Sequence, residues 1–200
     1  MNYLAHIFLS PPDPEQQLGS LIADFTRGQL VTLADDYALG IMQGIALHRK
    51  IDSFTDKNAW VLESKALFSA EHRRYAGIIL DILYDHFLNR NWTEYSSVDR
   101  GCFIAEFYQL LAQEEARLPI RLKRLAPRII REDWLGSYHD LQVLDRVYLR
   151  ISLRLRKPNP LDSALLEVKR LYSPLAENFA HFFPELMAFS EQQQRLLRLK

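Results

Sequence analysis

The chain has 200 residues, a mass of 23.4 kDa and no net charge, because 25 Lys and Arg balance 25 Asp and Glu. Its hydrophobic content of 48% is typical of a globular protein and argues against disorder. The single cysteine, Cys102, excludes an intrachain disulfide framework and a zinc site built from cysteines. The balanced charge and the absence of a visible leader or spanning segment predict a cytoplasmic protein that binds neither nucleic acid nor membranes.

Apolar residues recur at helical spacing along the chain, and alternating strand patterns of useful length are absent. We therefore predict one all-α domain over residues 1–200, in which prolines separate successive helices. The predicted helices are, in chain order, Asp36–Ile51, Glu71–Asn91, Val98–Leu118, Tyr138–Arg154, Leu161–Phe182 and Pro184–Leu199. The separating prolines are Pro119, Pro127, Pro158, Pro160, Pro174 and Pro184. Cys102 falls in an apolar helical pattern, so we expect it in the core rather than as a nucleophile.

The first predicted helix carries charged residues on its apolar face. At about 100° per residue, Ile41, Ile45, His48 and Asp52 fall within a stripe roughly 60° wide. An imidazole and a carboxylate four residues apart can converge on one cation. Taken alone, His48 and Asp52 are equally consistent with a simple ion pair.

A second predicted helix repeats the arrangement. Asp81 and Asp85 lie against the apolar face that Ile78 and Ile82 define, and His86 lies on the other side of that face. Burying two carboxylates is unfavourable unless protons, hydrogen bonds or a metal compensate. Together with Asp24, the two helices indicate a metal site made of imidazole and carboxylate ligands. Such ligands favour Mn²⁺ or Mg²⁺, with Fe²⁺ or Zn²⁺ as alternatives, and such a site suits hydrolysis of phosphate esters.

Four sequence blocks, read in order, resemble the acyl carrier protein phosphodiesterases. They are Met1-Asn2-Tyr3-Leu4-Ala5-His6, residues 19–28 (GSLIADFTRG), His48-Arg49-Lys50-Ile51-Asp52 and residues 81–88 (DILYDHFL). The resemblance covers essentially the whole chain. It implies an HD-domain-like helix bundle that uses a divalent metal, typically Mn²⁺. The adjacent pair here is Asp85 then His86, the reverse of the usual His-Asp order, and Ser20 stands where the family favours Asn.

The resemblance also implies an activity: hydrolysis of the phosphodiester that joins 4′-phosphopantetheine to a serine of holo-acyl carrier protein. Carried over block by block, the expected metal ligands are Asp24, His48, Asp52, Asp81, Asp85 and His86. Asp52 and Asp81 are candidates for the general base, and His6 is expected either to bind the metal or to orient a ligand. Arg27, Arg49 and Lys50 are candidates for binding the phosphate, although each is equally well explained as a surface cation.

A basic segment offers a surface for an acidic partner. Residues 117–157 contain 11 Lys and Arg against four Asp and Glu. Acyl carrier proteins are strongly acidic, so opposite charge would steer their encounter with this segment. The candidate contacts are Arg121, Lys123, Arg124, Arg128, Arg131, Arg146, Arg150 and Arg154. The alternatives are a metal phosphohydrolase of nucleotides or other small phosphate esters, and a helical binding module without catalysis.

Overall fold

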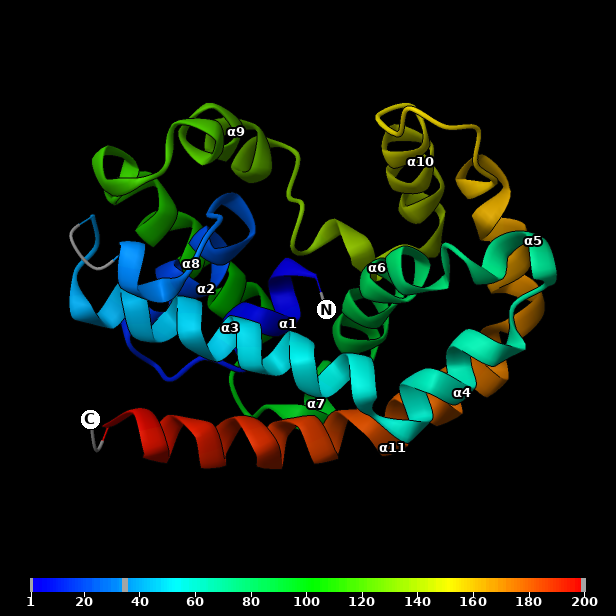
Figure 1. Cartoon of the computed structure of the whole chain (residues 1–200), viewed down its shortest axis with the longest axis horizontal. Coiled ribbons are helices and arrows are strands. Elements are labelled where there is room, and N and C mark those ends of the chain that lie inside the picture. The colour runs from blue at the N-terminus through cyan, green and yellow to red at the C-terminus, as the bar shows by residue number, and fades with distance from the viewer. Residues whose placement is uncertain (1, 34–35, 199–200) are drawn as a thin grey trace.

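Every regular element in the computed structural model, which describes residues 2–33 and 36–198, is a helix (Figure 1). The α-helices are α1 Tyr3–Phe8, α2 Pro14–Ile22, α3 Leu39–Lys57, α4 Ala59–Leu67, α5 Ala70–Arg73, α6 Ala76–Arg90, α7 Trp92–Tyr95, α8 Arg100–Gln113, α9 Ile120–Arg131, α10 Leu141–Ser152 and α11 Ala164–Arg198. Short 3-10 helices connect them: η1 Ala23–Phe25, η2 Leu30–Leu33, η3 Glu115–Arg117, η4 Ser137–His139 and η5 Leu161–Ser163. The all-α prediction is confirmed, and within these ranges no helix has both the length and the apolar character of a membrane span.

Several predicted boundaries were wrong. The prediction Glu71–Asn91 corresponds to two helices, α5 and α6, which a turn at Arg74 and Tyr75 separates. Prolines were poor markers of helix ends, because Pro127 lies inside α9, and Pro174 and Pro184 lie inside α11. A proline removes one backbone hydrogen bond but does not stop a helix whose apolar face keeps packing. The two predicted C-terminal helices are therefore one continuous helix.

Helix α11 lies along one edge of the molecule against α3 and α4, and its inner face contacts the central helix α6 (Figure 1). The fully buried ring of Tyr84 on α6 packs on Phe179 and Phe182, with centroids 5.3 and 5.5 Å apart. Residues 82–89 of α6 are all buried. Helix α6 therefore runs through the core, which makes any charged group on it costly unless it is paired.

Helices α2 and α3 approach each other closely at two glycines. A Cβ atom on Gly19 would collide with the carbonyl oxygen of Ile41, and one on Gly44 would collide with the carbonyl oxygen of Gln16. Only glycine permits backbones to pack this tightly. The contact holds the end of α2, and the η1 turn that follows it, against the middle of α3.

Candidate metal centre

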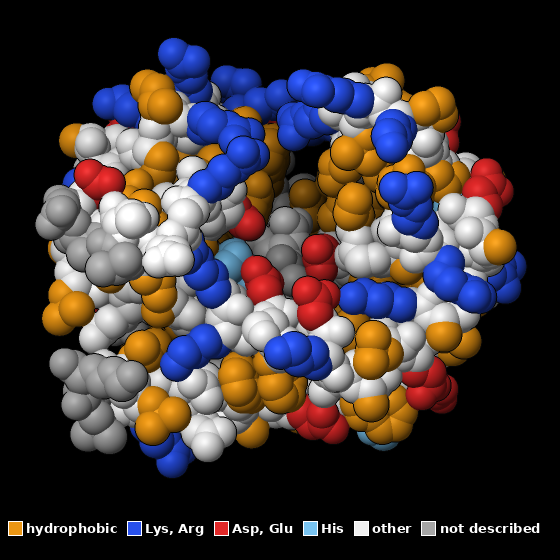
Figure 2. Space-filling view, in the orientation of Figure 1, with side chains coloured by type: hydrophobic (Ala, Val, Ile, Leu, Met, Phe, Trp, Pro, Cys, Tyr) orange, Lys and Arg blue, Asp and Glu red, His pale blue; other side chains and the backbone are white. Residues whose placement is uncertain are grey.

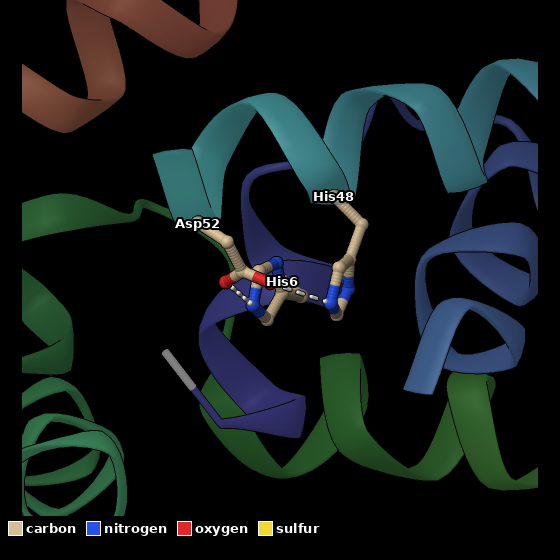
Figure 3. A group of neighbouring side chains, drawn as sticks. All are labelled: His6, His48 and Asp52. Carbon is tan, nitrogen blue, oxygen red and sulfur yellow. Dashed lines mark ion pairs between the residues drawn. The ribbon is translucent and has the colours of Figure 1, made fainter. Parts of the chain in front are cut away.

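Three side chains converge where α1 meets α3 (Figure 3). His6 projects from α1, and His48 and Asp52 project from successive turns of α3. The Nε2 atom of His6 lies 3.1 Å from Oδ1 of Asp52, and Nε2 of His48 lies 3.1 Å from Oδ2 of the same carboxylate. Each residue offers one ligand atom, and the three atoms lie within 4.8 Å of one another. The group can therefore hold a metal ion.

His6 is 1% exposed, yet neither of its ring nitrogens forms a hydrogen bond of good geometry with a residue in the described part of the chain. Its closest carboxylate contact is with Asp52, whose Oδ1 atom lies within ion-pair distance of Nε2. Burial, and then the charge of His48, lower the pKa of His6 to about 3. The ring is therefore neutral at physiological pH, which is the form that binds metals. A buried imidazole that has one carboxylate contact but no well-formed hydrogen bond to a described residue is costly in a purely structural role and fits a ligand position.

His48 is oriented by the backbone of α2. Its Nδ1 atom donates to the carbonyl oxygen of Ser20 at 2.8 Å, so in the neutral ring Nε2 carries the lone pair. That lone pair faces two carboxylates, Asp52 at 3.1 Å and Asp24 at 3.7 Å. The arrangement is repulsive unless a proton or a cation lies between these groups. The hydrogen bond from the far nitrogen to a carbonyl is also typical of metal-binding histidines.

The carboxylates form the solvent side of the group. The side chains of Asp24 on η1 and Asp52 are 39% and 43% exposed, whereas the two imidazoles beneath them are buried. Burial raises the pKa of Asp52, but its contacts with His48 and His6 outweigh this effect and hold the pKa well below its usual range. A half-exposed, ionised carboxylate over two buried imidazoles leaves an open side for a substrate, as catalytic metal sites require.

The structure places Asp85 beneath α1 and not in this group. Its carboxylate accepts hydrogen bonds from the backbone N–H groups of Leu4 at 2.9 Å and Ala5 at 3.1 Å. It therefore caps the N-terminus of α1, the helix that carries His6. Burial raises the pKa of Asp85 to about 7 despite these bonds. Asp81, one turn earlier on α6, is half-buried, and its charge acts on both Asp24 and Asp85.

His86 is engaged elsewhere. Its Nδ1 atom lies 2.7 Å from the carbonyl oxygen of Tyr138, and its Nε2 atom lies 2.8 Å from the hydroxyl of Tyr172. Both ring nitrogens are thus satisfied within the fold. The structure does not bring His86 together with His6, His48 and Asp52.

The predicted phosphate-binding cations differ in position. Arg27 is exposed shortly after η1, and Arg49 donates to the carbonyl oxygen of Gly28 at 2.9 Å. Lys50 donates to Gln193 of α11 at 2.8 Å, so it is tied to the opposite side of α3.

Cys102 is exposed, so its expected place in the core was wrong. The predicted pattern of apolar spacing was too loose there to fix which face of α8 is buried.

A hollow lies beside the metal centre between α9 and α10 (Figure 2). Basic side chains gather on both rims of it, and acidic side chains and a histidine lie at its floor. On α9 the exposed cations are Arg121, Arg124 and Arg131, whereas Lys123 pairs with Glu115 and Arg128 pairs with Glu132. Arg150 of α10 also pairs with Glu132, while Arg146 of α10 and Arg154, in the turn just after it, form no ion pair with a described residue. The sequence showed the charge but gave no sign of the cleft that it surrounds.

Sequence comparisons identify relatives along the whole chain. Residues 1–186 match the family described as acyl carrier protein phosphodiesterase. The acyl carrier protein phosphodiesterase of Serratia proteamaculans is 33% identical over 195 residues, covering 97% of this chain and all of the relative. Those of Yersinia enterocolitica and Salmonella dublin are 33% and 34% identical, and they cover 97% and 94% of this chain and 100% and 96% of their own lengths. No solved structure shows significant similarity. The chain therefore belongs to the acyl carrier protein phosphodiesterase family.

Proposed function

We propose that this protein hydrolyses the phosphodiester between 4′-phosphopantetheine and a serine of holo-acyl carrier protein, in a metal-dependent reaction. The observation that carries the proposal is the convergence of His6, His48 and Asp52, with a buried His6 that has no hydrogen bond to any other described residue. Family membership supplies the substrate. The products are apo-acyl carrier protein and 4′-phosphopantetheine. A cytoplasmic location and the lack of nucleic-acid binding stay predictions.

His6, His48 and Asp52 would hold the cation, and Asp24 would complete the set from η1. Two imidazoles and two carboxylates suit Mn²⁺, with Mg²⁺ or Fe²⁺ as substitutes. A divalent cation bound here supplies charge for the phosphoryl oxygens and lowers the pKa of water. These ligands on helices of an all-α domain support an HD-domain-like arrangement, which we include in the proposal.

The proton of the attacking water needs an acceptor in the chain. Asp52 is committed to His6 and His48, so we assign this role to the carboxylate of Asp81, which lies near Asp24. In the reaction a water oxygen bonds to phosphorus, the bond from phosphorus to the serine oxygen breaks, and that oxygen takes up a proton. Arg27, exposed beyond Asp24, is the best placed of the predicted cations to contact a phosphate oxygen.

Asp85 and His86 act in this proposal by positioning. Asp85 holds the N-terminus of α1, so it fixes where His6 lies. His86 links α6 to the Tyr138 backbone and to Tyr172 on α11. Neither needs to contact the metal. The basic rims on α9 and α10 face the acidic surface of the carrier protein, which they would orient over the cleft.

Mass spectrometry of holo-acyl carrier protein tests the proposal directly. The purified protein is stripped of metal with a chelator and incubated with the substrate, with and without added Mn²⁺. We expect loss of the phosphopantetheine mass only when metal is present. Retention of that mass with Mn²⁺ shown to be bound would reject the proposed substrate, and turnover of nucleotides under the same conditions would favour a small-molecule phosphohydrolase.

A matched pair of variants tests whether turnover requires the proposed metal site. Asp24→Asn removes a proposed ligand at a half-exposed position, whereas Asp36→Asn removes an exposed carboxylate from the segment before α3. We expect Asp24→Asn to abolish turnover and Asp36→Asn to leave it unchanged. Equal activity in both variants would remove Asp24 from the site.

A further inference from the structure

The hollow between α9 and α10 continues into a cleft of about 350 Å³. This volume lies at the lower end of the range of roughly 300–1,000 Å³ that small-molecule sites occupy. Its walls are mainly apolar or aromatic and come from α1, α6, η4 and α10, which meet only in the folded chain. The apolar wall residues are Tyr3, Ile82, Tyr138, Val143, Val147 and Ile151. The cleft therefore offers a substantial apolar surface to a ligand.

One end of the cleft adjoins the metal centre. Tyr3, which lines the cleft, precedes His6 by one turn of α1, and its ring stacks on Phe25 at 6.3 Å, directly after Asp24. Ile82 of the cleft directly follows Asp81 on α6. A ligand with one end at Asp24 and His6 thus has a continuous path along Tyr3 into the cleft.

The polar lining of the cleft is mixed. Asn2 supplies an amide and Ser137 a hydroxyl, while the charged side chains are Glu132, Arg146 and Arg150 of α10, and Arg154 just after that helix. Glu132 is paired with Arg128 and Arg150, so its charge is neutralised. The cleft thus matches a chain that is largely uncharged and apolar, carries a few amide or hydroxyl groups and is attached to an anion at one end.

We propose that this cleft binds the pantetheine arm of the substrate while the phosphate lies at the metal centre. This inference rests on the proposed function and adds a binding site to it. Beyond its phosphate, the arm is uncharged and carries a dimethyl group, a hydroxyl and two amides, which fit the apolar walls with Asn2 and Ser137. A nucleotide would instead bring a base with a full set of hydrogen-bonding groups, for which these walls offer few partners.

Trp134 provides a direct probe, because its side chain lines the cleft and those of Trp60 and Trp92 do not. The metal-free protein labelled with ¹⁵N shows three indole N–H signals, which Trp→Phe variants assign. We expect pantetheine, which lacks the phosphate, to shift the Trp134 signal and leave the other two in place. Adenosine 5′-monophosphate at the same concentration should not shift it. The reverse pattern, or no response to pantetheine at millimolar concentration, would overturn the proposal.

Two substitutions on α10 form the matched comparison. Val147→Phe fills the cleft, whereas Leu149→Phe adds the same ring at a position that is 44% exposed and outside the cleft. We expect Val147→Phe to abolish the Trp134 response and to lower kcat/KM for holo-acyl carrier protein by at least about tenfold. Leu149→Phe should leave both unchanged. Val143→Phe is a second cleft variant in case Val147→Phe does not fold, as thermal melting would show.

The two proposals fail in different ways. If the wild-type protein leaves holo-acyl carrier protein intact in the presence of Mn²⁺, the proposed function is rejected. If it hydrolyses this substrate but Val147→Phe and Val143→Phe are folded and fully active, only the cleft assignment is rejected.

Discussion

The carbonyl oxygen of Ser20 lies 2.8 Å from Nδ1 of His48, and this single contact orients the imidazole toward Asp52. The contact exists because α2 and α3 touch at glycines. A Cβ on Gly44 would also come within 2.9 Å of the Ser20 nitrogen. The packing of two helices thus fixes a proposed metal ligand from behind, in the way that outer hydrogen bonds orient metal-binding histidines in other proteins.

Gly44→Ala should therefore weaken metal binding without touching a ligand. The added methyl group pushes the Ser20 segment away from His48, and we expect Mn²⁺ affinity to fall by roughly 10–100-fold. Gly77→Ala on α6 is the control, because its Cβ would meet only Lys65, at 3.8 Å. Calorimetric titration of Mn²⁺ into both variants measures the difference. Unchanged affinity in Gly44→Ala would show that the Ser20 contact does not govern the site.

Replacing the imidazole ring of His6 and that of His86 should affect the stability of the metal-free protein differently. Apart from its contact with Asp52, His6 forms no well-formed hydrogen bond with a described residue, so His6→Leu should change the stability of the metal-free protein by no more than about 1 kcal/mol. His86→Leu breaks two hydrogen bonds and should cost about 2 kcal/mol or more. Urea unfolding without metal measures both values.

Repeating the unfolding with Mn²⁺ separates the roles of these histidines. At about 100 times its dissociation constant, a ligand that binds only the folded state adds about 2.7 kcal/mol. We expect this gain in His86→Leu and in the wild type, but not in His6→Leu. The opposite result would make His86 a ligand, as the sequence pattern predicted, and would leave His6 without a role.

The sequence predicted the part of the site that depends on local helix geometry. His48 and Asp52 lie one above the other on successive turns of α3, so their convergence follows from spacing alone. Asp85 and His86 show the limit of that argument. Helix phase indicated that Asp85 faces the core, but its partners are the backbone N–H groups of Leu4 and Ala5, some 80 residues away in the chain. A buried carboxylate that caps a helix and one that binds a metal produce the same sequence pattern.

The cleft could not be predicted from the sequence, for a similar reason. Val147 and Ile151 fall in the predicted helix Tyr138–Arg154 at the same helical spacing as Leu144 and Tyr148, so the pattern did not distinguish a cleft wall from a core face. In the structure Leu144 and Tyr148 fill the core, and the neighbouring stripe lines the cleft. Two apolar stripes side by side on one helix, next to a row of arginines, are the signal that a closer analysis could have used.

Asp85 should make the stability of the protein fall as pH rises. Burial raises its pKa from an ordinary value near 4 to about 7, so the folded state holds this proton more tightly than the unfolded chain does. The stabilisation is complete below about pH 4 and is lost as pH rises through about 7. Urea unfolding with chelator should show the stability of the wild type relative to Asp85→Asn declining from about pH 5 to about pH 7 and levelling off above it.

The exposed helix cap Asp99 is the control for that experiment. Its hydrogen bond with the Cys102 backbone lowers its pKa, so its stabilising contribution is constant above about pH 5. The difference between the wild type and Asp99→Asn should be flat over the same range. A flat profile for Asp85→Asn as well would mean that Asp85 is ionised throughout and that its helix-capping bonds outweigh its burial.

Asp81 and Asp52 should differ in what their removal costs. Asp81 is the proposed proton acceptor, so Asp81→Asn should lower kcat by roughly 10²–10⁴-fold, with little effect on Mn²⁺ affinity. Asp52→Asn should lose metal affinity together with activity, because Asp52 contacts both imidazoles. Mn²⁺ titration and steady-state kinetics on holo-acyl carrier protein measure the two effects. Equal loss of metal binding in both variants would make Asp81 a ligand instead.

The arginines of α10 and of the turn after it should govern encounter with the carrier protein more than the chemical step. Arg146 and Arg154 form no ion pair with a described residue, so their charge is available to an acidic partner. In the double variant Arg146→Glu/Arg154→Glu we expect KM for holo-acyl carrier protein to rise at least about tenfold at low salt, while kcat changes far less. The difference should shrink at about 0.5 M salt, because the screening length then falls below 10 Å. Lys169→Glu, which reverses an exposed charge on α11, is the control and should leave KM unchanged. A salt-independent rise in KM, or an equal rise in Lys169→Glu, would show that the α10 arginines are not the surface that the carrier protein meets.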